Sequence, residues 1–441
     1  MDALGATIIV TTLLFLFLGL GVWIFAAMVL VSVTALTVVL DFDLLRIGAT
    51  LKATMWRSSS TWELSAIPLF VAMGEVIFRT DISQRLFNGL APWVNFLPGR
   101  LLHVNIGGCT LFAAVCGSSA ATTATVGKIT TTALIERGYS KRLSIGSLAG
   151  AGSLGIMIPP SIPLIVYGIL GEVSISHLFA AGVMPGLLVA ALFSGYIMLV
   201  CKIWPDLTPA RVDPYTWHDR LVGLWNLAPV VFLVVIVLGG IYAGFVTPSE
   251  AAALGFAATL LLAMAMGKFT WKLFVDSMMG AVETSTMIIT IIVSASFMSS
   301  TVSLLHVPQE VARAIAALNL STTELMIIIS LFYILLGCFL DGVSMIVLSL
   351  PVTLPLILSR GIDPVWFGVF LVLHIELAMI TPPVGFNLFV LQGMTGRPLG
   401  YIAWASLPFF FLMLGAVVIV SVFPDIALWL PSVLFPSTRV G

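Results

Sequence analysis

Residues 117–168 read GSSAATTATVGKITTTALIERGYSKRLSIGSLAGAGSLGIMIPPSIPLIVYG. The helix-breaking glycines and prolines of this stretch recur later in the chain with the same spacing. Its GSS (117–119), ERG (136–138) and IPPS (158–161) are matched by FLDG (339–342), SRG (359–361) and TPPVG (381–385). Gly138 and Gly361 are 223 residues apart, and the same offset separates Pro159 from Pro382 and Pro185 from Pro408. The chain therefore contains an internal duplication.

The composition is that of an integral membrane protein. Hydrophobic residues make up 60% of the chain and charged residues 9%, whereas soluble proteins carry roughly 25% charged residues. The mean hydropathy is +1.14. The net charge of −1 argues against a nucleic-acid partner, and no basic n-region or small-residue cleavage site indicates a signal peptide. Apolar runs long enough to cross a bilayer as helix lie near 3–20, 22–40, 63–80, 178–203, 220–240, 250–267, 276–303 and 401–425.

Four further apolar stretches are interrupted at their centres. Residues 101–135 are broken at Gly117–Ser119 and residues 322–358 at Asp341–Gly342, so each is interpreted as a re-entrant helical hairpin. Residues 142–168 and 364–391 are each broken by a proline pair. Proline removes backbone donors and frees carbonyl groups, which must be satisfied inside the bilayer. Such carbonyls are suitable cation ligands.

Basic residues predict the orientation of this arrangement. With alternating spans and two hairpins that do not cross, twelve of the 19 Lys and Arg residues fall on one side, which we expect to be cytoplasmic. The other, outer side collects only Arg46, Lys52, Arg57, Arg313, Arg360 and Arg439. Both termini would be outside, and the two copies would have opposite orientation. The first hairpin would open to the cytoplasm and the second to the periplasm.

The predicted fold is thus an all-α polytopic membrane protein with two inverted-topology repeats, each containing a hairpin and a proline-broken helix. Inverted repeats with broken helices are typical of secondary transporters. The predicted division is residues 1–62, N-terminal scaffold helices and interfacial connector; 63–203, first repeat; 204–275, connector and scaffold helices; 276–425, second repeat; and 426–441, C-terminal tail.

The breaks supply the candidate ion ligands. Ser118 and Ser119 offer hydroxyl oxygens suited to a hard cation such as Na⁺, although small residues also serve as helix contacts in membranes. Asp341 is a carboxylate in an apolar hairpin, which marks it as functional, although it could equally cap the following helix. Gly152, Gly155 and Pro160 would let backbone oxygens approach an ion, and Thr381 and Pro383 occupy the matching break.

Other polar residues in apolar runs leave alternatives open. Asn387 could contact a substrate or satisfy a freed carbonyl, and Lys128 could attract an anion or extend to the interface. Glu75, Glu283 and Glu376 are interpreted as packing or interdomain contacts rather than ligands. The candidate substrate contacts are Ser119, Thr122, Ser161 and Asn387. No cofactor is expected besides a coupling ion, because the four cysteines lack metal-ligand spacing.

These motifs resemble the large membrane subunit of tripartite ATP-independent periplasmic (TRAP) transporters. The resemblance rests on residues 117–168, on IPLFVAMGE before them, and on FLDGVSMIVLSLPVTLP and ITPPVGFNLFVLQG after them. It implies an elevator-type, Na⁺-driven importer of the ion transporter superfamily in the bacterial inner membrane. The implied first Na⁺ site comprises Ser118, Ser119, Gly152, Gly155 and Pro160, and the second Asp341, Gly342, Thr381 and Pro383.

The resemblance also implies partners. A separate small membrane subunit of about four helices and a periplasmic solute-binding protein would accompany this chain, and the substrate would be an organic acid such as a C4-dicarboxylate, a sugar acid or sialic acid. A stand-alone Na⁺/carboxylate symporter remains the alternative. An intramembrane enzyme is disfavoured because HExxH and GxSxG motifs are missing, and direct use of ATP because no GxxxxGK[ST] motif is present.

Overall fold

The computed structural model describes residues 3–209, 215–318, 320–383 and 385–436. Throughout these ranges the regular structure is helical, with no strand, which confirms the predicted all-α class. Residues 210–214 of the predicted connector, Val384 of the second proline motif and residues 437–441 of the predicted tail lie outside the described ranges.

Ten α-helices and three short 3₁₀ turns make up the described first half of the chain. They are α1 Ala3–Gly19, α2 Ile24–Leu40, α3 Leu44–Ser59, η1 Trp62–Ser65, α4 Ala66–Phe78, α5 Ile82–Val94, α6 Leu102–Cys116, α7 Ser119–Glu136, α8 Lys141–Ser153, η2 Leu154–Ile156, α9 Ile162–Gly171, α10 Ile175–Ile203 and η3 Pro205–Leu207.

The described second half follows a similar series. Its elements are α11 Trp217–Val234, the π-helical segment η4 Val235–Gly239, α12 Gly240–Tyr242, α13 Pro248–Ala265, α14 Trp271–Leu304, α15 Val307–Ala317, α16 Thr322–Gly337, α17 Gly342–Ser359, α18 Pro364–Met379, α19 Phe386–Thr395, α20 Leu399–Val422 and α21 Asp425–Leu434.

Helix bounds repeat with the offset found in the sequence. Helices α7 and α17 are both 18 residues long, and their first residues, Ser119 and Gly342, are separated by the same 223 positions. Helices α9 and α19 are both 10 residues long and begin within one residue of this offset. The correspondence also pairs α2 with α13, which precede the segments predicted as the two repeats. The duplication therefore extends to these outer helices.

All four predicted helix interruptions are present. Helix α6 ends at Gly117, whose φ of 64° lies in the left-handed region, and α7 begins after the N-cap Ser118. Residues 338–341 separate α16 from α17, with Asp341 as N-cap. The Pro159-Pro160 and Pro382-Pro383 peptide bonds are cis and lie between α8 and α9 and between α18 and α19. Each copy therefore contains two helix interruptions, one in its hairpin and one at its proline pair.

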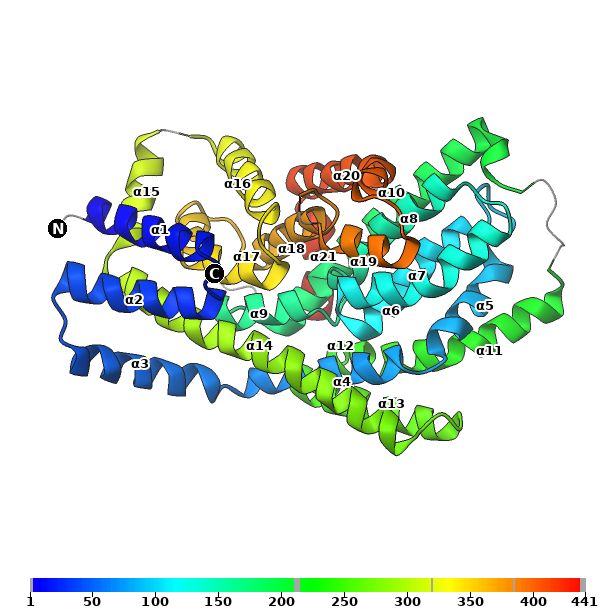
Figure 1. The fold of residues 1–441 in the computed structure, drawn as a ribbon, viewed down its shortest axis with the longest axis horizontal. Coiled ribbons are helices and arrows are strands. Elements are labelled where there is room, and N and C mark those ends of the chain that lie inside the picture. The colour runs from blue at the N-terminus through cyan, green and yellow to red at the C-terminus, as the bar shows by residue number, and fades with distance from the viewer. Residues whose placement is uncertain (1–2, 210–214, 319, 384, 437–441) are drawn as a thin grey trace.

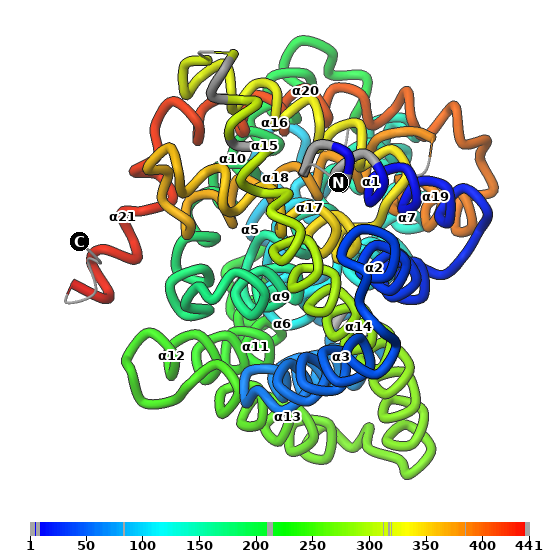
Figure 2. The backbone as a smooth tube through the Cα atoms, turned by 90° about the vertical axis from the view of Figure 1, so that its left-hand side faces the viewer, coloured from blue at the N-terminus to red at the C-terminus, as the bar shows by residue number. Residues whose placement is uncertain are grey.

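The helices form two broad layers (Figures 1 and 2). Helices α3, α11, α13 and α14 lie along the lower side in both views, with α4 beside them in Figure 1, while α16, α18 and α20 lie above them. Helix α14 is continuous over 34 residues. Its counterpart in the first half is divided, because α3 and the segment Trp62–Phe78 meet at an angle of 59°. This bend opens space beside α14.

Burial distinguishes inner from outer helices. By length and composition, six helices in the described residues are able to cross a membrane, or seven if the bent pair counts as one span. The apolar window of α10 is only 28% buried, whereas that of α17 is 61% buried. Exposed large apolar side chains, such as Leu199, Leu261 and Phe411, would face lipid. Helix α17 instead lies inside the bundle, as expected for an arm of a hairpin.

Candidate ion-binding sites at the helix breaks

The tip of the first hairpin packs directly onto the break of the first proline helix. A Cβ atom on Gly117 would lie 2.6 Å from the carbonyl oxygen of Pro160. A Cβ on Gly155 would lie 2.7 Å from the carbonyl oxygen of Ser118 and 2.7 Å from Oγ1 of Thr122. Only glycine allows such close approach of backbone to backbone. The structure therefore brings four of the five residues predicted for the first ion site, Ser118, Ser119, Gly155 and Pro160, to this junction.

Ser119 joins three separate elements. Its side chain is buried, and its hydroxyl donates to the carbonyl oxygen of Gly152 at 3.0 Å. The side-chain amide of Asn387 donates back to the same hydroxyl at 2.8 Å. Asn387 is fully buried at the start of α19, 268 positions away in sequence. The first hairpin, the first broken helix and the second broken helix thus meet at Ser119. The bond to Gly152 also brings the fifth residue predicted for the first ion site to this junction.

Neighbouring threonines carry hydroxyl groups without partners. Thr122 and Thr123 are completely buried, and within the described residues neither hydroxyl has a hydrogen-bond partner. A buried hydroxyl left unsatisfied costs about 1–3 kcal/mol. Both lie at the junction, since Thr122 faces Gly155 and Thr123 faces Gly152. Unpartnered hydroxyl oxygens beside carbonyl oxygens fit a hard monovalent cation. In the described residues no cluster of three His, Cys, Asp or Glu offers an alternative metal site.

Ser161 has a local role in this structure. It is the N-cap of α9, where its hydroxyl accepts from the Leu164 amide at 3.4 Å and donates to the carbonyl oxygen of Ile156. The hydroxyl therefore satisfies a carbonyl that the proline pair frees. Of the four candidate substrate contacts, Ser119, Thr122 and Asn387 gather at the junction, while the Ser161 side chain is engaged with its own break.

The tip of the second hairpin is more open. Asp341 is exposed, and its carboxylate accepts from the amides of Val343 at 3.1 Å and Ser344 at 3.4 Å and from the Ser344 hydroxyl. The capping role considered for Asp341 is therefore realised. Gly342 is buried against α18, where an added Cβ would lie 2.4 Å from Cγ2 of Ile375. The second tip thus contacts the helix before its break.

The second proline break is correspondingly accessible. Thr381 is half-buried and donates to the Leu377 carbonyl at 2.5 Å, while Pro382 and Pro383 are exposed. A cavity of about 280 Å³, mostly apolar, is lined by Thr381, Pro382 and residues of α20. Asp341 and Gly342 are not among its lining residues. The residues predicted for the second ion site are thus on facing elements, but they are less closely gathered than those of the first.

Glu376 is a buried carboxylate that the sequence motifs do not assign to an ion or substrate site. It lies on α18, is completely buried, and has no hydrogen-bond partner for either carboxylate oxygen within the described residues. The amide of Met157, in the first break, is the backbone group that approaches it. The sequence predicts a packing or interdomain contact for Glu376, and its burial beside the opposite break agrees with that prediction. Its signal in the sequence is a carboxylate five positions before Thr381 in an otherwise apolar run.

Other predicted polar positions lie elsewhere. Glu75 forms an ion pair with Arg79 at 3.0 Å, one turn away on its own helix. Lys128 and Glu283 are exposed. These residues are separate from the junction.

Comparisons with known proteins identify the family. The family model described as "Tripartite ATP-independent periplasmic transporter, DctM component" matches residues 11–426. The C4-dicarboxylate TRAP transporter large permease protein of Pseudomonas aeruginosa is 33% identical over 384 residues, covering 86% of this chain and 88% of that protein. The ectoine TRAP transporter large permease protein of Halomonas elongata is 30% identical over 382 residues, with coverages of 84% and 87%.

A third relative is longer than this chain, and its name combines two components. The isethionate TRAP transporter permease protein DctMQ of Oleidesulfovibrio alaskensis is 33% identical over 376 residues, which is 84% of this chain but 58% of that protein. Among solved structures, the Alcanivorax borkumensis YdaH transporter superposes with a TM-score of 0.61 at 14% identity, covering 88% of this chain and 90% of its own. That likeness shows a shared fold.

The family match over nearly the whole chain agrees with the helical architecture and the paired helix breaks, and the named relatives are transporter permeases, not enzymes. The chain is a member of the DctM family, the large permease component of tripartite ATP-independent periplasmic transporters.

Proposed function

We propose that this chain carries a small organic acid across the bacterial inner membrane, driven by an inward Na⁺ gradient. The observation that carries the proposal is the junction at Ser119, where buried hydroxyls without partners among the described residues and carbonyl oxygens of the first copy meet the Asn387 side chain of the second. Such a site offers oxygen ligands, and the described part of the chain has no cluster of three His, Cys, Asp or Glu there, which suits Na⁺ better than a transition metal.

In this proposal, Ser118, Ser119, Gly152, Gly155 and Pro160 hold one Na⁺, and Asp341, Gly342, Thr381 and Pro383 hold a second. Both sets flank one substrate position, which Ser119, Thr122 and Asn387 contact directly, with Ser161 at its edge. Because the bonds between Ser119, Gly152 and Asn387 tie the two copies together, a bound ion would stabilise the closed arrangement of all three elements. The ion and the acid thereby favour the same conformation, which is the thermodynamic requirement for coupling.

Transport requires that the loaded site faces each side in turn. We propose that the two copies are inverted and that the hairpins and broken helices move as a unit against the outer helices, as in an elevator. The open second tip and the closed first junction support this, since an exposed Asp341 and exposed Pro383 leave one side accessible. The inner membrane location follows the predicted orientation, with the basic-poor side facing the periplasm.

The partners in the proposal are a separate small membrane subunit and a periplasmic solute-binding protein that delivers the acid. The fused isethionate relative, whose name combines two components and whose length exceeds this chain, supports the existence of a companion membrane segment. The relatives' names include a C4-dicarboxylate, ectoine and isethionate. The substrate panel should therefore contain these three and a sugar acid.

The test is uptake of radiolabelled succinate, ectoine, isethionate and gluconate into proteoliposomes, with and without a Na⁺ gradient. The purified chain is assayed alone and together with the proposed small subunit and binding protein. Asp341→Asn and Ser119→Ala are compared with Asp425→Asn, which changes a carboxylate at the start of α21, far in sequence from both breaks.

Uptake that needs Na⁺ and the partners, is lost in Asp341→Asn and Ser119→Ala, and persists in Asp425→Asn would support the proposal. Na⁺-driven uptake by the chain alone would identify a stand-alone symporter instead. Uptake that is indifferent to Na⁺ would refute the coupling ion, and full activity of both site variants would refute the assignment of the sites.

A further inference from the structure

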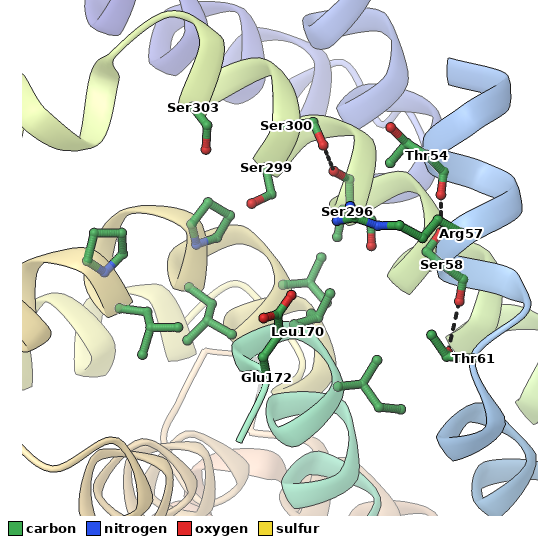
Figure 3. A pocket seen from close by; sticks show the side chains of 17 residues that line it. Thr54, Arg57, Ser58, Thr61, Leu170, Glu172, Ser296, Ser299, Ser300 and Ser303 are labelled. Atoms are coloured by element: carbon green, nitrogen blue, oxygen red, sulfur yellow. Dashed lines mark hydrogen bonds between the residues drawn. The ribbon is translucent and has the colours of Figure 1, made fainter. Parts of the chain in front are cut away.

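A second cavity, with polar and charged side chains in its lining, lies away from the helix breaks at the bend between α3 and α4. It encloses about 270 Å³ and is bounded by α3, α14, the end of α9 and the middle of α17 (Figure 3). Its α14 wall carries Ser296, Ser299, Ser300 and Ser303. Its volume is close to the roughly 300 Å³ at which small-molecule pockets begin. It is large enough for a small organic acid.

Two opposite charges face this cavity without pairing. Arg57 reaches from α3 toward Ser296, and the Glu172 carboxylate points from the end of α9 toward the α14 wall (Figure 3). Among the described residues, neither takes part in any of the ion pairs that form, which involve Arg79, Lys268 and Arg313. Glu172 also has a φ of 52°, in the left-handed region that disfavours non-glycine residues. Such residues are concentrated at functional sites.

The hydroxyl groups divide into donors and acceptors. Ser296 and Ser300 donate back to carbonyl groups of their own helix, at 3.0 and 2.9 Å, so their oxygens are left as acceptors. Within the described residues, Thr54, Ser299 and Ser303 have no protein hydrogen-bond partner for their hydroxyls. Together with the guanidinium of Arg57, these hydroxyls can donate to an anion. Glu172 supplies a strong acceptor opposite them.

The duplication shows that the fold does not require this polarity. At the 223-residue offset, the first-copy counterparts of Ser296, Ser299 and Ser300 are Met73, Val76 and Ile77. These three counterparts occupy the same helix positions but are buried apolar side chains. The counterpart of Arg57 is Gly280. Small polar residues often serve helix packing in membranes, but here the same helix position packs with large apolar residues in the other copy. The serines and the arginine therefore distinguish one copy of the duplication from the other.

We propose that this cavity is a waiting site for a monocarboxylic acid that carries hydroxyl groups, with its carboxylate on Arg57 and its hydroxyls donating to Glu172. The proposal rests on the proposed transport function and adds a substrate class to it. Arg57 belongs to the predicted outer side, so the acid would occupy this cavity before it reaches the helix breaks. A dicarboxylate would place a second negative charge against Glu172, which is unfavourable. An unsubstituted fatty acid would leave Glu172 and the accepting oxygens of Ser296 and Ser300 without donors.

Three six-carbon acids test this class with matched length: gluconate with hydroxyls, hexanoate without them, and adipate with two carboxylates. The full-length chain in lipid nanodiscs carries Cys338→Ser and the reporter Ser299→Cys, and the readout is the rate of modification by a polar thiol reagent. The remaining cysteines, Cys109, Cys116 and Cys201, are buried. Ser303→Cys provides a second reporter should the first variant fold poorly.

Gluconate is expected to slow the modification, while hexanoate and adipate have little effect. Arg57→Gln should weaken gluconate protection about tenfold or more, because a charge-assisted hydrogen bond is lost. The control Lys52→Gln removes an exposed charge from the same helix outside the cavity and should leave protection unchanged. Glu172→Gln should let adipate protect, since the repulsive carboxylate is gone.

Absence of gluconate protection at millimolar concentrations, or equal protection by all three acids, would overturn the proposal. Modification that is slow without any acid and accelerates when anionic lipids are omitted would also overturn it, because a lipid headgroup would then fill the cavity. Na⁺-driven uptake without protection would leave the proposed function standing and remove only the waiting site. Protection without any Na⁺-driven uptake would refute the transport proposal instead.

Discussion

Gly155 offers the sharpest test of the first ion site. In Gly155→Ala, the new methyl carbon would lie 2.7 Å from the Ser118 carbonyl oxygen, 2.7 Å from Cα of Ser119 and 2.7 Å from Oγ1 of Thr122. Each atom would have to retreat by about 0.7 Å to reach an ordinary contact of 3.4 Å. Two of the three belong to backbone and cannot rotate away, so the hairpin tip itself must move from the break.

The energetic consequence follows from overpacking. Forcing an additional methyl group into a close-packed site costs about 1–3 kcal/mol. If this cost falls on the arrangement that binds Na⁺, it corresponds to a roughly 5- to 150-fold increase in the Na⁺ concentration needed for half-saturation. We therefore expect the purified variant to remain folded but to need much more Na⁺ for thermal stabilisation.

The assay compares the unfolding temperature of wild type and Gly155→Ala across a Na⁺ titration, with K⁺ replacing Na⁺ to keep ionic strength constant. Gly393→Ala is the matched control, because it lies in α19 and a Cβ there would meet nothing within 4 Å. Alanine is the better helix former, so the control should be neutral or slightly stabilised. A wild-type Na⁺ response in Gly155→Ala would refute the placement of the site.

Three further variants address the surrounding groups. Thr122→Val should stabilise the ligand-free chain, because it removes a buried hydroxyl without a partner among the described residues, and should reduce the stabilisation that the transported acid provides; an unchanged response to the acid in thermal unfolding would contradict its role as a substrate contact. Asn387→Leu should cost about 0.5–1.5 kcal/mol, because it removes the amide that donates to the Ser119 hydroxyl, which keeps its own bond to the Gly152 carbonyl, measured against Asn88→Leu at an exposed site; equal losses would argue against the link. Glu376→Gln should raise the unfolding temperature in Na⁺-free buffer, because an unpaired buried carboxylate is destabilising, whereas a large loss of stability would indicate a partner for its charge.

The helix breaks could be predicted because their causes are local. A proline pair cannot continue a helix, and a glycine followed by a serine ends one helix and caps the next. Pro159, Pro382 and Gly117 therefore marked the interruptions from sequence alone, and the repeated offset indicated that the interruptions were paired. The all-helical fold and the family followed from the same features.

The contacts across the junction could not be predicted in the same way. Asn387 has Leu164 at its counterpart position in the first copy, so the duplication gave no indication that it bonds to Ser119. Glu376 can be identified from sequence as a carboxylate in an apolar run. The direction in which its side chain points depends on how α18 packs against the first break. Hydrophobic periodicity is weak when a helix is buried on every side, and α18 is buried along nearly its whole length. The second cavity likewise depends on the bend between α3 and α4, which no residue of the straight counterpart α14 predicts.

The two hairpin tips solve the same packing problem with opposite residues. Ser119 lies against Gly152 in the first copy, and their counterparts at the 223-residue offset, Gly342 and Ile375, also lie against each other. In the first copy, α8 supplies the glycine and the hairpin tip supplies the Ser119 hydroxyl, which donates to the Gly152 carbonyl oxygen. In the second copy the tip supplies the glycine, and the Ile375 side chain occupies the space where a tip hydroxyl would otherwise lie. A ligand at the second tip must then come from the neighbouring position, which is where Asp341 replaces the counterpart Ser118. One duplicated contact therefore places a buried hydroxyl at the first tip and an accessible carboxyl group at the second.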